Sequence, residues 1–77
     1  MSNPQPFEFK GDYITLGQFL KATDQVQSGG EVKNILSAGA VLVNGTTETR
    51  RGRKLRQGDI VLYGRLCYRL ESTANRL

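Results

Sequence analysis

A block of positive charge in the second half of the sequence has the chemistry that is simplest to interpret. It contains Arg50, Arg51, Arg53, Lys54 and Arg56, with no acidic residue among them. A guanidinium group donates paired hydrogen bonds to phosphate and stacks its flat face on an unpaired base. The formal net charge is +4, so the remainder of the chain carries 4 − 5 = −1. Such a local patch predicts a polyanionic partner; the alternative is a solvated loop whose arginines only increase solubility.

A second candidate anion site lies where a helix is expected to begin, at Ser28, Gly29 and Gly30. Backbone N–H groups and the helix dipole favour an anion at a helix N-terminus, and glycines let a phosphate approach closely. Lys33, one turn later, would add a charge. The alternative for Ser28 is that it only caps the helix. Asn44 also has two interpretations, because a tight turn explains it and its amide is a candidate contact as well.

The composition argues against an enzyme. There is no histidine, and the single cysteine, Cys67, has no partner for an intramolecular disulfide. Structural zinc and Ser-His or Cys-His catalysis are thereby excluded. The carboxylates are dispersed, and we find no catalytic residue, no metal ligand and no cofactor motif. No segment has a signal-peptide pattern or the length to span a bilayer, so we expect a cytoplasmic protein with neither a membrane nor a small-molecule substrate as partner.

The elements that must position the cations can be predicted from periodicity. Residues 7–10 alternate apolar and charged side chains, which predicts a short edge strand. Thr15 and Gln18 have the spacing of a capping box and predict a helix that ends near residues 22–23. Ser28 and Glu31 repeat that spacing at the start of a second helix, which Gly39 ends. Each helix has one apolar stripe, formed by Leu16, Phe19 and Leu20 in the first and by Val32, Ile35 and Leu36 in the second.

A β-rich half follows the helices. The dipeptide Asn44-Gly45 lies between residues 41–43 and a threonine-rich run, which predicts a hairpin with a type I′ turn. Leu55 is expected in the core, residues 57–59 form a turn, and residues 60–63 form an apolar strand. A Gly64-Arg65 turn of type II′ leads to the last strand at residues 66–70.

Together these elements predict an α+β fold. We expect a two-helix hairpin packed on a small, mostly antiparallel sheet of about four to five strands. At 77 residues there is room for one domain. We expect this domain at residues 7–70, between a flexible leader at residues 1–6 and a flexible tail at residues 71–77.

Three separated motifs resemble the S4 RNA-binding domain, in matching order and spacing. They are Ser-Gly-Gly-Glu-Val-Lys at residues 28–33, Gly-Ala-Val-Leu-Val-Asn-Gly at residues 39–45 and Arg-Lys-Leu-Arg-Gln-Gly-Asp at residues 53–59. The resemblance covers about residues 15–70 and is greatest to the small, free-standing bacterial members. It implies the αL motif, in which two helices pack on a small sheet and the helix-hairpin surface contacts structured RNA.

The resemblance and the charge pattern predict a non-catalytic RNA-binding protein, a monomer, that docks structured RNA such as ribosomal RNA or tRNA, with the ribosome as a candidate partner. The predicted RNA-binding residues are Ser28, Gly29, Gly30, Lys33, Asn44, Arg50, Arg51, Arg53, Lys54 and Arg56. About five phosphate contacts would give a slope of log affinity against log salt of roughly −3.5 to −4.5. Reversing three of the arginines, at positions 50, 51 and 53, to glutamate is expected to abolish binding and leave the fold intact. The alternative function is a protein-interaction or assembly adaptor that uses the same basic patch.

Overall fold

The computed structural model describes residues 3–23 and 29–73, which form two helices and two sheets. The elements in chain order are β1 (Gln5–Phe9), β2 (Ile14–Thr15), α1 (Leu16–Ala22), α2 (Gly29–Ser37), β3 (Val41–Val43), β4 (Thr46–Thr47), β5 (Lys54–Leu55), β6 (Ile60–Tyr63) and β7 (Leu66–Ser72). This arrangement confirms the predicted α+β class.

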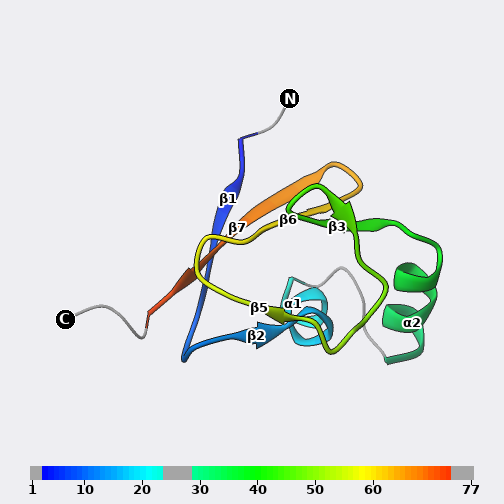
Figure 1. The fold of residues 1–77 in the computed structure, drawn as a ribbon, viewed down its shortest axis with the longest axis horizontal. Coiled ribbons are helices and arrows are strands. Elements are labelled where there is room, and N and C mark those ends of the chain that lie inside the picture. The colour runs from blue at the N-terminus through cyan, green and yellow to red at the C-terminus, as the bar shows by residue number, and fades with distance from the viewer. Residues whose placement is uncertain (1–2, 24–28, 74–77) are drawn as a thin grey trace.

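The larger sheet has five strands in the order β1-β7-β6-β3-β4. Three of its four pairings are antiparallel, but β1 and β7 run parallel and side by side (Figure 1). The predicted edge position of β1 is confirmed. The first strand begins earlier and the last strand ends later than predicted: β1 begins at Gln5 instead of residue 7, and β7 continues to Ser72 instead of residue 70. Residues 5–6 and 71–72 therefore belong to the sheet, not to a leader or a tail, since each of these strands supplies the other's hydrogen-bond partners.

The helix boundaries follow from local hydrogen bonds that the sequence predicts. Thr15 and Gln18 form the expected capping box at the start of α1. At the C-terminal end of α2, Gly39 has a φ of +74°. The Gly39 N–H donates to the Leu36 carbonyl at 3.0 Å, and the Ala40 N–H donates to the Ile35 carbonyl at 3.3 Å. This pair of bonds is the Schellman motif, which ends a helix at a residue with positive φ.

The turns of the larger sheet also have the predicted chemistry. Asn44 (φ 53°) and Gly45 (φ 85°) both occupy the left-handed region, as a type I′ turn between β3 and β4 requires. At the β6–β7 turn only Gly64 has positive φ (61°), which fits type II′. These two-residue turns fix the register that aligns Val43 with Thr46 and Tyr63 with Leu66.

A second, two-stranded sheet was missed by the sequence analysis. β2 pairs antiparallel with β5, so that Ile14 lies opposite Leu55 and Thr15 opposite Lys54. We call this pair the β2–β5 ribbon; Figure 1 shows it apart from the larger sheet, with α1 continuing from β2. Leu55 is fully buried, as predicted, and Ile14 packs against the core. The ribbon thus has one face in the core and the other in solvent.

The core lies between the helices, the ribbon and the inner face of the larger sheet. It consists of Phe9, Leu16, Phe19, Leu20, Val32, Leu36, Val41, Val43, Leu55, Val61 and Leu70. Both predicted helix stripes contribute to it, although Ile35 is only partly buried. Phe19 also forms edge-to-face contacts with Phe7 (4.9 Å between centroids) and Tyr68 (5.4 Å). These rings fix α1 against β1 and β7, and through α1 they fix the loop described next.

Candidate functional site

The first turn of α1 holds the segment that carries the arginines. We call residues 50–53 the arginine loop. The Leu16 N–H donates to the Arg53 carbonyl at 2.8 Å, and the Gly17 N–H donates to the Arg51 carbonyl at 2.9 Å. The first N–H groups of a helix have no partner within the helix, so these bonds satisfy them. The N-terminus of α1 therefore orients the loop.

α1 and the arginine loop approach each other closely at Gly17. A Cβ atom on Gly17 would lie 3.4 Å from the Arg51 carbonyl oxygen, 3.5 Å from the Arg51 Cβ and 3.9 Å from a methyl group of Val32 on α2. A larger side chain has no room there unless the loop or the helix moves. Gly17 is thus the contact point of three segments.

A buried carboxylate organises two of the five cations. Glu48 Oε2 accepts a hydrogen bond from Arg50 Nε at 3.1 Å, and Glu48 Oε1 accepts one from Arg53 Nη1 at 2.8 Å. The Arg50 backbone N–H also donates to Oε2 at 3.2 Å. Only 10% of the Glu48 side chain is exposed, compared with 73% for Arg50 and 34% for Arg53. The carboxylate therefore lies under the two guanidinium groups and limits where they point.

These contacts change the acidity of Glu48. The side-chain hydrogen bond from Arg50, helped by the Arg50 backbone N–H and by Arg53, lowers the pKa of Glu48 from 4.5 to about 2, against the opposing effect of burial. The same pairing raises the pKa of Arg50. Glu48 is consequently ionised at neutral pH, and the cation block together with Glu48 carries 5 − 1 = +4.

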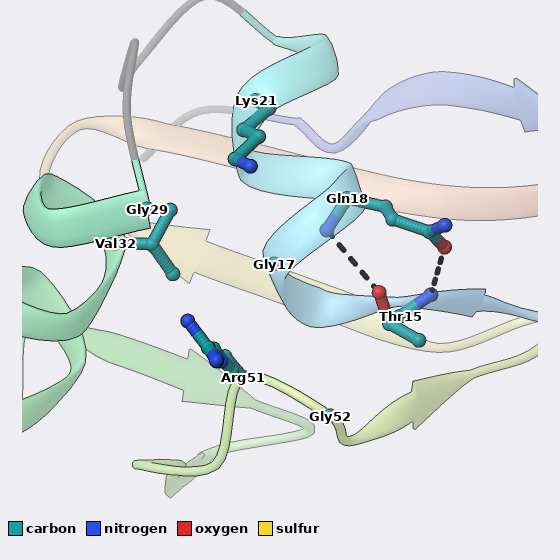
Figure 2. A pocket seen from close by; sticks show the side chains of 8 residues that line it. All are labelled: Thr15, Gly17, Gln18, Lys21, Gly29, Val32, Arg51 and Gly52. Carbon is teal, nitrogen blue, oxygen red and sulfur yellow. Dashed lines mark hydrogen bonds between the residues drawn. The ribbon is translucent and has the colours of Figure 1, made fainter.

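Arg51 points in a different direction, toward the start of α2. Its Nη1 lies 3.9 Å from the position that a Cβ atom would occupy on Gly29. Figure 2 shows the Arg51 side chain rising from the loop toward Gly29 and Val32, with the Thr15–Gln18 capping bonds on the other side of Gly17. A hollow of about 400 Å³ lies between these segments, lined by Thr15, Gly17, Gln18, Lys21, Gly29, Val32, Arg51 and Gly52.

Two further hollows adjoin this one through shared residues. One, of about 470 Å³, is lined by Lys33, Leu36, Ser37, Thr49 and Arg51. The other, of about 370 Å³, is lined by Arg50, Gly52, Arg53 and Lys54. Six cations border the three hollows, and we call them the basic surface: Lys21, Lys33, Arg50, Arg51, Arg53 and Lys54. Since Arg51 and Gly52 each line two hollows, the surface is continuous from α2 to β5.

The other predicted site residues are placed differently. Gly30 is exposed in the first turn of α2, and Ser28 lies outside the described residues. The Asn44 side chain donates to Asp59 at 3.1 Å and accepts from the Ile60 N–H at 2.9 Å, so it joins the β3–β4 turn to the start of β6. It lines none of the three hollows. Arg56 lies beside Tyr13, with its Cζ 5.7 Å from the ring centroid.

Several residues of this region were not predicted from the sequence: Glu48, Lys21 and Gly17. Of these, the burial of Glu48 could have been predicted from the hairpin register. With a two-residue turn at residues 44–45, Val41 is opposite Glu48, and the Glu48 N–H donates to the Val41 carbonyl at 3.0 Å. Because Val41 is buried, a side chain opposite it on the same face is expected to be buried as well. Lys21 and Gly17 gave no such signal, since a lysine and a glycine in a helix are compatible with plain solvent exposure.

Neither a metal-binding cluster nor a membrane-spanning helix occurs among the described residues. Within residues 3–23 and 29–73 no three His, Cys, Asp or Glu side chains are grouped so that they could hold a metal ion. The helices in those ranges are too short and too polar to cross a membrane.

Comparison with known proteins places the chain in a family. A curated relative, the "Probable ribosome maturation protein RlbA" of Bacillus subtilis (strain 168), is 54% identical over 56 residues, which cover 73% of this chain and 79% of the relative. The family model described as "S4 domain" matches residues 7–71, a range that includes both helices, the β2–β5 ribbon, all six cations of the basic surface and the larger sheet except for the first two residues of β1 and the last residue of β7. The chain is therefore a member of the S4 domain family.

Proposed function

We propose that this protein is a non-catalytic RNA-binding protein that docks structured RNA on the basic surface. The observation that carries this proposal is the position of Arg51, which extends from the arginine loop to the first turn of α2. A guanidinium group and the positive end of a helix dipole at one hollow favour the same ligand, a phosphate group. Lys21 and Lys33, on either side of Arg51, extend the positive charge to the neighbouring phosphates of a chain.

The geometry and the relative both support the choice of target class. Folded RNA presents phosphates on two sides of a groove, and the basic surface offers cations along three adjoining hollows. The relative's name includes ribosome maturation, so we propose ribosomal RNA, with tRNA as the other structured candidate, and the assembling ribosome as the partner. Such a role is cytoplasmic, and one copy of the domain, a monomer, presents the whole surface.

The most direct test replaces Arg51 with alanine and measures affinity for a folded ribosomal RNA fragment over a range of salt. One lost phosphate contact reduces the slope of log affinity against log salt by about 0.7 to 0.9. Arg65→Ala is the matched control, because Arg65 is exposed in the β6–β7 turn and borders none of the three hollows. Equal slopes for the two variants would refute the proposed site.

Single replacement at Arg51 is a cleaner test than reversing several arginines. Arg50 and Arg53 contact the buried Glu48 carboxylate, so a glutamate at either position would bring two negative charges together and destabilise the hairpin. We therefore expect such a triple reversal to destabilise the fold as well as to abolish binding. Arg51 makes no ion pair among the residues that the structure describes.

A competition experiment distinguishes RNA binding from the alternative function, a protein-interaction adaptor. Structured RNA is expected to displace a labelled RNA from the protein, and an acidic polypeptide of equal charge is expected to be much weaker. The reverse order would favour a protein partner for the basic surface.

A further inference from the structure

Tyr13 is an exposed aromatic residue beside the basic surface. Its side chain is 43% exposed, while the described Phe7, Phe19 and Tyr68 rings pack on one another. Continuing the register of the β2–β5 ribbon by one residue places Tyr13 opposite Arg56. Because side chains alternate along a strand, Tyr13 and Arg56 lie on the face opposite to buried Leu55.

Two cations accompany the Tyr13 ring. Lys54 Nζ lies 4.9 Å from the ring centroid, and Arg56 Cζ lies 5.7 Å from it. Such contacts are weak at an exposed site, so the cations can turn to a ligand without a large loss. Lys54 also lines the hollow of Arg50 and Arg53, which makes the Tyr13 face a continuation of the basic surface.

This group of side chains fits one kind of ligand. A flat ring with two adjacent cations matches a nucleotide whose base is unstacked and whose phosphates are close by, since aromatic side chains stack on unpaired bases. A continuous duplex hides the faces of its bases, and an acidic peptide would engage the cations but offer no flat group to the ring. These side chains therefore favour unpaired over paired RNA as the ligand of the ribbon.

We propose that Tyr13, Lys54 and Arg56 bind an unpaired nucleotide that adjoins the folded RNA held by Arg51. This inference rests on the proposed function and deepens it, because the preferred target becomes a junction between paired and single-stranded RNA. Tyr13 supplies stacking, and the two cations supply charge to the flanking phosphates.

The absence of tryptophan from the sequence allows a direct test. A Tyr13→Trp variant carries a single fluorescent reporter at the proposed subsite. The probes are one RNA stem-loop with a blunt end and the same stem-loop with a single-stranded adenosine overhang, both at low salt, where phosphate contacts suffice for binding. The overhang is expected to quench the tryptophan, and the blunt RNA is not. The control is Leu62→Trp, since Leu62 is 38% exposed on the larger sheet.

Affinity gives a second readout. The overhang is expected to tighten binding of the unmodified protein by about 5- to 150-fold, the range for one stacked base. Tyr13→Ala is expected to remove this gain and leave affinity for the blunt RNA unchanged, whereas Tyr13→Phe keeps the gain. If circular dichroism shows that Tyr13→Ala is poorly folded, the other two variants test the subsite: Tyr13→Phe has to keep the gain in affinity, and the overhang has to quench the tryptophan of Tyr13→Trp.

The outcomes separate this inference from the proposed function. Blunt RNA that binds through Arg51, with no gain from the overhang, overturns the Tyr13 subsite only. A gain that survives Tyr13→Ala overturns it too. Absence of RNA binding by the unmodified protein overturns both proposals.

Discussion

Replacing Glu48 with glutamine is expected to destabilise the protein at neutral pH and to have almost no effect in strong acid. The pKa of Glu48 falls from 4.5 to about 2 in the folded chain. A difference of about 2.5 units corresponds to roughly 3 kcal/mol of unfolding free energy as an upper limit. Because Arg50 is 73% exposed, solvent screening reduces this, and we expect about 1 to 2 kcal/mol. For a domain of this size the loss is roughly 5 to 15 °C in Tm.

The direction of the pH dependence follows from the lowered pKa. Folding favours the ionised carboxylate, so its contribution is fully present above the unfolded pKa of about 4.5 and is lost as pH falls toward 2. Glutamine resembles the protonated acid and has no such transition. The stability difference between the unmodified protein and the Glu48→Gln variant should therefore close between about pH 4.5 and pH 2.

Urea denaturation followed by circular dichroism, repeated from neutral pH into acid, measures this difference. Glu71→Gln is the matched control, because Glu71 pairs with Arg69 on β7 at 2.8 Å and its side chain is more exposed than that of Glu48, at 24% compared with 10%. We expect that control to cost less than about 1 kcal/mol. The reasoning would be refuted if the loss of unfolding free energy in Glu48→Gln stayed constant with pH, or if it were no larger than the loss in the control.

Two further variants test the scaffold that holds the arginine loop. Gly17→Leu is expected to displace the loop and weaken RNA binding, because a Cβ atom at Gly17 already reaches 3.4 Å from the Arg51 carbonyl and the rest of a leucine side chain has to extend beyond it. In the same assay Gly17→Ala, whose Cβ would make only van der Waals contacts, should bind nearly normally. Leu55→Ala is expected to cost about 2 to 5 kcal/mol in urea denaturation, since the side chain is fully buried. Leu62→Ala, at a 38% exposed position, should cost under about 1 kcal/mol.

The parts of the fold that depend on neighbouring residues were predictable from the sequence. The capping box at Thr15, the Schellman end at Gly39 and the Asn44-Gly45 turn each involve residues within a few positions of one another. Their hydrogen bonds are decided by local side chains and by tolerance of positive φ. The helix stripes were predictable for the same reason, because helical periodicity is a local pattern.

The missed features all join distant parts of the chain. The parallel pairing of β1 with β7 connects the two ends, and the two-residue strands of the β2–β5 ribbon are too short to have a periodic signal. For the site, the sequence analysis located the five cations but predicted the same RNA-binding role for each of them. It did not reveal that α1 holds the arginine loop through Leu16 and Gly17, because backbone acceptors have no sequence signature.

The five cations of the block have different contacts in the structure. Arg50 and Arg53 pair with Glu48, and Lys54 and Arg56 lie over Tyr13. Within the part of the chain that the structure describes, Arg51 alone of the block has no ion pair or ring contact, and it points to the start of α2. Like charges held this close repel one another, and the buried Glu48 carboxylate offsets that repulsion for Arg50 and Arg53. Among the described residues, the charged groups of Lys54 and Arg56 contact only the exposed Tyr13 ring, which carries no charge, and Arg51 has neither kind of contact, so we expect an external phosphate to bind Arg51 first.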